Sequence, residues 1–150
     1  MIAIHRSDTM KIINIEGCVL GRVGARVAKM LLSGEEVVLV NVGSAVISGN
    51  PQATTAKYSA RRSAKNKANP EHSPHWSRRP DLLVRRMLRG MLPYRTTRGR
   101  AAFKRLKVFT GQPVDFEKAE TIEGTNASKL RTRFITINEL CKNLGFRVGK

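Results

Sequence analysis

The spacing of hydrophobic residues changes twice within the first fifty positions and predicts an α/β unit. Lys11–Gly17 (KIINIEG) reads as a short strand, and Leu20–Leu32 places its larger apolar residues three or four positions apart, as on one face of a helix. Gly34 closes this helix. Val37–Val42 (VVLVNV) is a largely β-branched run, which is typical of a parallel strand covered on both faces. A strand, a helix and a strand in succession predict a βαβ unit.

A second helix and a long loop are predicted next. The stretch VISGNP (46–51) reads as a third short strand that ends in a turn. Asn50 is suited to cap a helix that begins at Pro51 and runs to about Lys65. Residues 66–79 (NKANPEHSPHWSRR) contain two prolines and no apolar period, so we expect a long irregular loop, which in a compact domain is usually functional or disordered.

Apolar residues in the following helix come in pairs four positions apart. Pro80 opens this helix and Pro93 ends it. The pairs are Leu83 and Val84, Met87 and Leu88, and Met91 and Leu92. This spacing predicts that the pairs face the core, whereas Arg85, Arg86 and Arg89 occupy the other side and face outward.

Three further elements are predicted towards the C-terminus. A short helix covers about Thr97–Leu106, and Lys107–Phe109 is a strand. Thr136 and Glu139 form a capping-box pattern at the start of another helix. The apolar stripe of that helix consists of Ile137, Leu140, Cys141 and Leu144, and it ends at Gly145. We interpret Cys141 as a core residue.

Length and composition are those of one folded domain. The chain has 150 residues, 41% of them hydrophobic, and a formal net charge of +17. Residues 51–110 contain sixteen basic and two acidic residues, so this block alone has a net charge of +14. We expect a single domain over residues 1–150, with a basic block at about 51–110 and a peripheral C-terminal tail at about 114–150. Such a charge predicts binding to nucleic acid or to an anionic membrane.

Cysteine usage and hydropathy indicate a soluble protein of a reducing compartment. Cys18 and Cys141 lie far apart and match no metal-ligand spacing. No segment resembles a signal peptide or approaches eighteen consecutive apolar residues. We therefore expect an intracellular location.

A glycine pattern after the first strand is the best indication of an enzyme. Gly17, Gly21 and Gly24 lie where dinucleotide-binding folds hold a pyrophosphate, so a nucleotide-binding enzyme using the Gly17–Gly24 turn is the alternative function. The spacing is GxxxGxxG instead of GxGxxG, however, and the second strand ends near Asn41 without a ribose-binding acid. We interpret the glycines as allowing a tight turn and close packing, and we expect no enzymatic activity, no catalytic residue, no cofactor and no small-molecule substrate.

No other group of side chains predicts a catalytic or metal site. Glu71, His72 and His75 lie together in a loop, but a metal site needs three or four convergent ligands. The downstream acidic residues are interpreted as a solvated face; they are Asp115, Glu117, Glu120 and Glu123. A membrane-bound amphipathic helix is a third alternative, but the arginine-rich helix lacks interfacial Trp or Phe. Because the core explains its apolar side, we expect no binding to a membrane.

Arginine predominates in the basic block and favours RNA as the partner. The block contains eleven arginines and five lysines, and guanidinium groups bind phosphate bidentately and stack on bases. Candidates for stacking on unpaired bases are Tyr58, His75, Trp76 and Tyr94. Because the chain has no helix-turn-helix spacing, zinc-finger pattern or basic zipper, we expect an α/β protein that recognises folded RNA by shape and backbone.

Three segments resemble a known protein family. LGRVGARVAKMLL (20–32), VVLVNVGSAVISGN (37–50) and RGMLPYRTTRGRAAFKRLKVFTGQP (89–113) are similar to the thirteenth protein of the large ribosomal subunit. KYSARRSAKNKANP (57–70) resembles the archaeal and eukaryotic branch of that family. The resemblance implies a three-layer α/β/α fold with a four-stranded parallel sheet, extended by long basic loops and helices. It also implies a structural constituent of the large subunit of the cytoplasmic ribosome. Such a protein binds ribosomal RNA, supports ribosome assembly and translation, and contacts neighbouring ribosomal proteins.

The resemblance further indicates which residues face RNA. The expected surface covers Lys57–Lys67, Arg78–Arg79 and Arg85–Arg105. Its predicted RNA-binding side chains are Lys57, Arg61, Arg62, Lys65, Lys67, Arg78, Arg79, Arg85, Arg86, Arg89, Arg95, Arg98, Arg100, Lys104 and Arg105.

Overall fold

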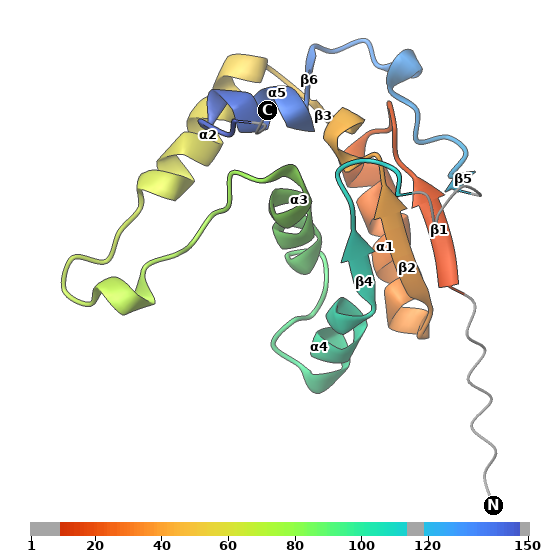
Figure 1. Cartoon of the computed structure of the whole chain (residues 1–150), viewed down its shortest axis with the longest axis horizontal. Helices are drawn as coiled ribbons and strands as arrows, with labels where there is room; N and C mark the ends of the chain where they lie inside the picture. Colours follow the sequence, from red (N-terminus) through yellow and green to blue (C-terminus); the bar gives the residue numbers. More distant parts are fainter. Residues whose placement is uncertain (1–9, 114–118, 148–150) are drawn as a thin grey trace, which may run out of the picture.

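The computed structural model describes residues 10–113 and 119–147, and these form an α/β domain (Figure 1). The strands are β1 (Met10–Asn14), β2 (Glu36–Val40), β3 (Val46–Ser48), β4 (Leu106–Val108), β5 (Glu120–Thr121) and β6 (Phe134–Thr136). The helices are α1 (Leu20–Ser33), α2 (Pro51–Ser63), α3 (Pro80–Arg89), α4 (Thr97–Lys104) and α5 (Ile137–Asn143). Single 3₁₀ turns include η1 (Val42–Ser44) and η2 (Pro70–His72). Asp115 and Glu117 lie outside the described residues.

Four strands form one parallel sheet in the order β4-β2-β1-β5. Val37 and Val38 of β2, which point to opposite faces, are both almost completely buried, as expected for a strand covered on both sides. The strand ends at Val40, two residues earlier than its hydrophobic run, because Asn41 adopts a left-handed conformation with φ of 56°. The predicted α/β class and four-stranded parallel sheet are confirmed.

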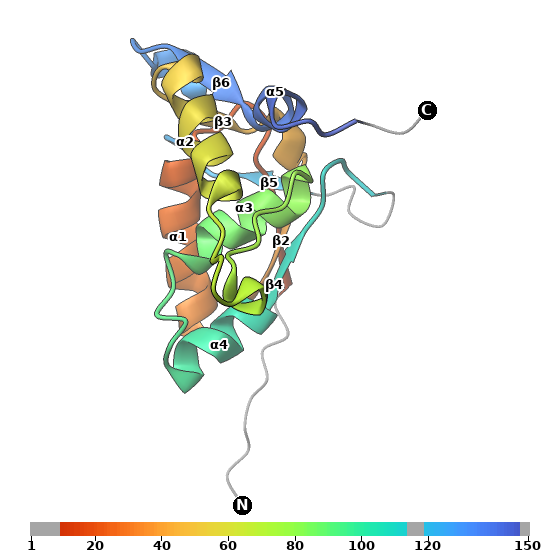
Figure 2. The same cartoon turned by 90° about the vertical axis from the view of Figure 1, so that its left-hand side faces the viewer.

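Helices α1, α3 and α4 lie on one side of this sheet (Figure 2). The apolar face of α1, with Val23 and Val27, packs into the same core as Leu83 and Leu88 of α3. A Cβ atom added to Gly24 would lie 2.9 Å from Leu88 Cδ2, so this glycine permits the close approach of α1 to α3. Gly34 ends α1 with a left-handed φ of 106°, as predicted.

A second, antiparallel sheet contains β3 and β6. Thr136 at the end of β6 caps α5, because its hydroxyl accepts a hydrogen bond from the Glu139 backbone N–H at 3.2 Å. The predicted apolar stripe of α5 is buried, and Cys141 is fully enclosed in the core. The sequence predicted the strand β3 but not its pairing, because an antiparallel partner ninety residues away leaves no local signal.

The predicted helix Pro80–Pro93 is shorter than expected. Helix α3 ends at Arg89, and a series of turns follows from Gly90. Because the helical spacing stops there, Met91 is 41% exposed, whereas Leu92 remains buried. The prediction that Met91 faces the core is therefore wrong. The prediction that Arg85 faces outward is also wrong in part, since its side chain is half-buried and its Nε atom is enclosed.

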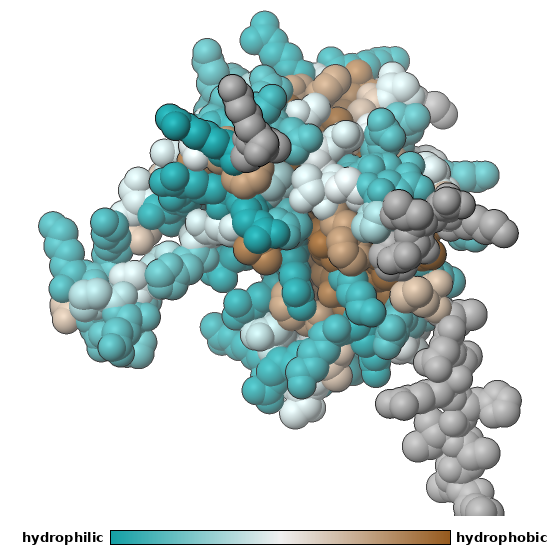
Figure 3. Space-filling view, viewed as in Figure 1, coloured by the Kyte–Doolittle hydropathy of each residue, from teal (hydrophilic) through white to brown (hydrophobic). Residues whose placement is uncertain are grey.

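The C-terminal half of α2 and residues 64–79 project from the body of the domain (Figure 1). We call this segment, residues 57–79, the arm. Asn50 caps α2 by accepting a hydrogen bond from Gln52 N at 3.0 Å, as predicted, and the helix gives way to the expected irregular loop after Ser63. The projecting surface is mostly hydrophilic (Figure 3).

Candidate nucleic-acid interface

The fifteen predicted RNA-binding residues divide into three groups according to what their side chains contact. The first group is exposed and forms no hydrogen bond, ion pair or ring contact with any described residue. Its members are Lys57, Lys65, Lys67, Arg95, Arg100 and Lys104. Long, unpaired cationic side chains on the arm, in the turn after α3 and on α4 are free to contact phosphates.

In the second group, guanidinium groups lie over aromatic rings, and two of these arginines are at the base of the arm. The guanidinium carbons of Arg61 and Arg86 lie 5.0 and 4.7 Å from the centre of the Trp76 ring. Arg61 also lies 5.3 Å from the centre of Tyr58, and the two rings meet edge to face with their centroids 5.9 Å apart. The arm is thus held against α3 by alternating aromatic rings and arginines.

A similar cluster joins α3 to α4. Arg89 lies over Tyr94 with its guanidinium carbon 3.9 Å from the ring centre, and Tyr94 contacts Phe103 edge to face with their centroids 5.4 Å apart. Arg85 lies 4.8 Å from the centre of the Phe103 ring. Phe103 was not among the predicted site residues, because its role depends on the folding of α4 back onto α3.

The third group of arginines binds other parts of the protein. Arg62 donates to Leu144 O at 2.9 Å, and Arg78 donates to Gly145 O at 3.5 Å. Both carbonyls lie at the C-terminal end of α5, where backbone acceptors lack helical partners and the helix dipole favours a positive charge. These contacts attach both ends of the arm's loop to the body.

Two arginines likewise donate hydrogen bonds to backbone carbonyl groups at the C-terminal end of α1. Arg98 donates to Leu32 O at 3.3 Å, and Arg105 donates to Leu31 O at 3.4 Å. Arg79 forms a bidentate ion pair with Asp81, at 2.8 and 3.2 Å, next to the start of α3. These three side chains therefore have structural partners in addition to any role in RNA binding.

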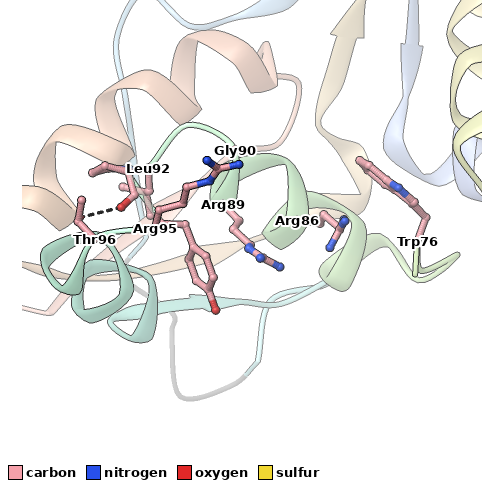
Figure 4. Close-up of a pocket in the computed structure, with 9 residues that line it drawn as sticks. Trp76, Arg86, Arg89, Gly90, Leu92, Arg95 and Thr96 are labelled. Carbon is pink, nitrogen blue, oxygen red and sulfur yellow. Dashed lines mark hydrogen bonds between the residues drawn. The ribbon is translucent and has the colours of Figure 1, made fainter. Parts of the chain in front are cut away.

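A hollow of about 660 Å³ lies between the base of the arm and the turn that follows α3 (Figure 4). Arg86 and Arg89 extend into it from α3, with Trp76 on one side and Arg95 on the other. Thr96 fixes the turn, since its hydroxyl donates to Pro93 O at 2.8 Å and accepts from Gly99 N at 3.1 Å.

The four predicted stacking residues have different environments. His75 is exposed, whereas Trp76 and Tyr94 are half-buried and line the hollow. Tyr58 is only 9% exposed, and burial raises the pKa of its hydroxyl above the ordinary value, although Arg61 acts in the opposite direction. Its ring is part of the packing between α2 and Trp76, which leaves little of it for a base.

The Gly17–Gly24 turn is occupied by contacts within the protein. Gly17, with a left-handed φ of 62°, donates to Ser44 O at 3.2 Å and accepts from Ala127 N at 2.8 Å. Val19, which precedes α1, donates to Thr125 O at 2.7 Å. These contacts favour our interpretation of the glycines as residues of a tight turn.

The described residues contain no group of three or more His, Cys, Asp or Glu side chains placed to hold a metal ion. Within the same part of the chain, no helix is sufficiently long and apolar to cross a membrane.

Comparison with known proteins gives consistent matches. Residues 8–115 match the family described as "Ribosomal protein L13". The chain is 45% identical over 138 residues to "Large ribosomal subunit protein uL13" of Methanocaldococcus jannaschii, an alignment that covers 91% of this chain and 98% of that protein. Proteins of the same name from Methanococcoides burtonii and Natronomonas pharaonis are 42% and 37% identical, over 139 and 142 residues. These two alignments cover 91% and 94% of this chain, and 98% and 94% of those proteins.

Proposed function

The chain belongs to the ribosomal protein L13 family, and we propose that it binds large-subunit ribosomal RNA through the arm and the arginine-rich surface of α3 and α4. Membership of this family confirms the expected class, a non-enzymatic protein of the large ribosomal subunit. We further propose that it acts in the cytoplasmic ribosome, beside other large-subunit proteins, and that it supports subunit assembly by holding separate RNA segments in one geometry.

One observation carries this proposal: the six unpaired cationic side chains extend from the arm, from the turn after α3 and from α4. Three more arginines, Arg61, Arg86 and Arg89, lie over aromatic rings, and their N–H groups can also contact phosphate. Together they amount to the number of cationic groups that a protein needs to neutralise about six to ten phosphates. The block's net charge of +14 is otherwise a self-repelling surface, and phosphates remove that repulsion.

Binding of purified large-subunit RNA at several salt concentrations tests the proposal. If about six to ten phosphates are contacted, the affinity should fall by roughly 10³–10⁵ between 50 and 200 mM salt. Arg95→Met and Lys104→Met should each reduce the slope of log affinity against log salt concentration by about 0.7–0.9. The matched control is Lys142→Met, which removes one exposed charge outside the basic block. An affinity that does not depend on salt would contradict the proposal.

A further inference from the structure

The hollow beside α3 combines two kinds of surface that phosphate binding alone does not require. Part of its lining is aromatic or aliphatic, and the rest consists of guanidinium groups. The side chains that form these two kinds of surface are Trp76, Arg86, Arg89, Leu92, Tyr94 and Arg95. A surface that contacts only the RNA backbone needs charge but no apolar lining, so this combination indicates a ligand with both an anionic and a flat apolar part.

Two of the guanidinium groups are already oriented by aromatic rings. Arg86 lies 4.7 Å from the centre of Trp76, and Arg89 lies 3.9 Å from the centre of Tyr94. A guanidinium group stacked on a ring offers its opposite face to another flat group, while its N–H donors remain in the plane for an anion. Arg95, which has no partner among the described residues, is the free donor at the rim of the hollow (Figure 4).

The size of the hollow suits one nucleotide. Its volume of about 660 Å³ falls within the range of about 300–1,000 Å³ that is usual for sites of small ligands. Single-stranded loops of RNA present unstacked bases, which proteins bind on aromatic rings and on guanidinium planes.

We propose that the hollow binds one unstacked nucleotide of the RNA. The base lies in the apolar part between Trp76 and Tyr94, stacked on the outer face of a ring-bound guanidinium group, and Arg95 binds a flanking phosphate. This inference rests on the proposed function, because it names the RNA feature that one part of the same surface recognises.

Short oligonucleotides test this site separately from the rest of the surface. We would titrate the full chain at 50 mM salt with a single-stranded RNA pentamer that contains all four bases, and with a pentamer of abasic ribose phosphates of equal charge. Trp76 is the only tryptophan of the chain, so its fluorescence reports a base that enters the hollow. Base stacking should make the pentamer with bases bind roughly 5- to 150-fold more tightly, and only this pentamer should quench the emission.

Matched variants separate the base from the phosphate. Tyr94→Leu should reduce the preference for the pentamer with bases, whereas Tyr94→Phe should retain it, because the ring still supports Arg89. Arg95→Met should weaken the binding of both pentamers by the same factor. Its side chain has no described partner, so this variant is expected to fold normally even if Tyr94→Leu does not.

Equal affinity for the two pentamers, quenching by both of them, or no measurable binding of either would overturn the nucleotide site. Binding of large-subunit RNA to the same protein preparation distinguishes this failure from that of the proposed function. If the large-subunit RNA still binds with strong salt dependence, only the nucleotide site is wrong. If that binding is also absent, the proposed function itself is contradicted.

Discussion

Replacement of Arg62 and of Arg100 by methionine should separate structural arginines from those that we propose to bind RNA. Arg62 is half-buried and donates to Leu144 O at 2.9 Å at the end of α5, whereas Arg100 is exposed and has no described partner. Methionine keeps most of the aliphatic stem in each case and removes one charge, so the two variants differ mainly in the lost hydrogen bond.

The magnitude follows from that hydrogen bond. A hydrogen bond to a charged group stabilises a protein by about 1.5–3 kcal/mol, and the partial exposure of Arg62 reduces this to about 1–2 kcal/mol. For a chain of this size, the midpoint of thermal unfolding changes by about 2–4 °C per kcal/mol, so Arg62→Met should lower it by roughly 2–8 °C. Arg100→Met should change the free energy of unfolding by less than about 0.5 kcal/mol.

Thermal unfolding followed by far-UV circular dichroism measures the first effect, and RNA binding against salt concentration measures the second. Arg100→Met should lower the slope of log affinity against log salt concentration by about 0.7–0.9, with an almost unchanged midpoint of thermal unfolding. If Arg100→Met lowered that midpoint as much as Arg62→Met, the division of the arginines into free and structural groups would be incorrect.

Three further predictions concern the fold and its buried groups. Gly99→Ala should destabilise the domain by about 1–3 kcal/mol in urea unfolding, because the new Cβ atom would overlap the carbonyl group of Pro93. Gly111→Ala is the control and should have little effect, because a Cβ atom added there would have no neighbour within 4 Å. Asn50→Ala should cost about 1 kcal/mol through the lost cap of α2, measured in the same way. Burial and, secondarily, the nearby Asp81 carboxylate raise the pKa of the Cys141 thiol to about 12. Its alkylation by iodoacetamide at pH 8 should therefore be on the order of a thousandfold slower than that of an unperturbed thiol, as measured by mass spectrometry.

The same thiol contributes to the pH dependence of stability. Because the pKa of Cys141 is higher in the folded state than the value of 9.0 for a free thiol, the unfolded chain loses this proton first as the pH rises. The contribution of the neutral thiol is therefore fully present below about pH 9 and is lost between about pH 9 and 12. Urea unfolding at pH 8 and pH 10.5, with Cys141→Ala as the control, measures it; an equal loss of stability in both proteins would show that other groups cause the decline.

Elements with a local cause could be predicted from the sequence. Asn50, Thr136 and Gly34 determine helix ends through their own side chains or backbone, and each acts as predicted. The end of α3 was missed, because the apolar pairs continue beyond Gly90 although the helix does not. Periodicity shows which residues prefer to be buried, but Met91 lies in a turn whose course depends on α4.

The sequence predicts where the basic region lies but not which contact each of its arginines makes. A count of charges locates the basic block, since every arginine contributes equally to it. Whether a particular arginine binds a helix end, a ring or nothing depends on residues distant in the sequence: Arg62 binds Leu144 O, and Arg98 binds Leu32 O. These pairings arise only in the folded chain.

The ring-bound arginines also explain how so basic a surface can be arranged in the free protein. Arg61 and Arg86 both lie near Trp76, and from their distances to its centre their guanidinium carbons are at most about 10 Å apart. At 5–10 Å and the effective dielectric constant of about 20 that is typical near a protein surface, their repulsion is about 1.7–3.3 kcal/mol, and salt reduces it. Each contact of these arginines with Trp76 contributes about 0.5–1 kcal/mol, so attraction to the ring offsets a substantial part of the repulsion. The base of the arm is thereby arranged in the free protein, which reduces the entropy that would be lost if RNA binds there as we propose.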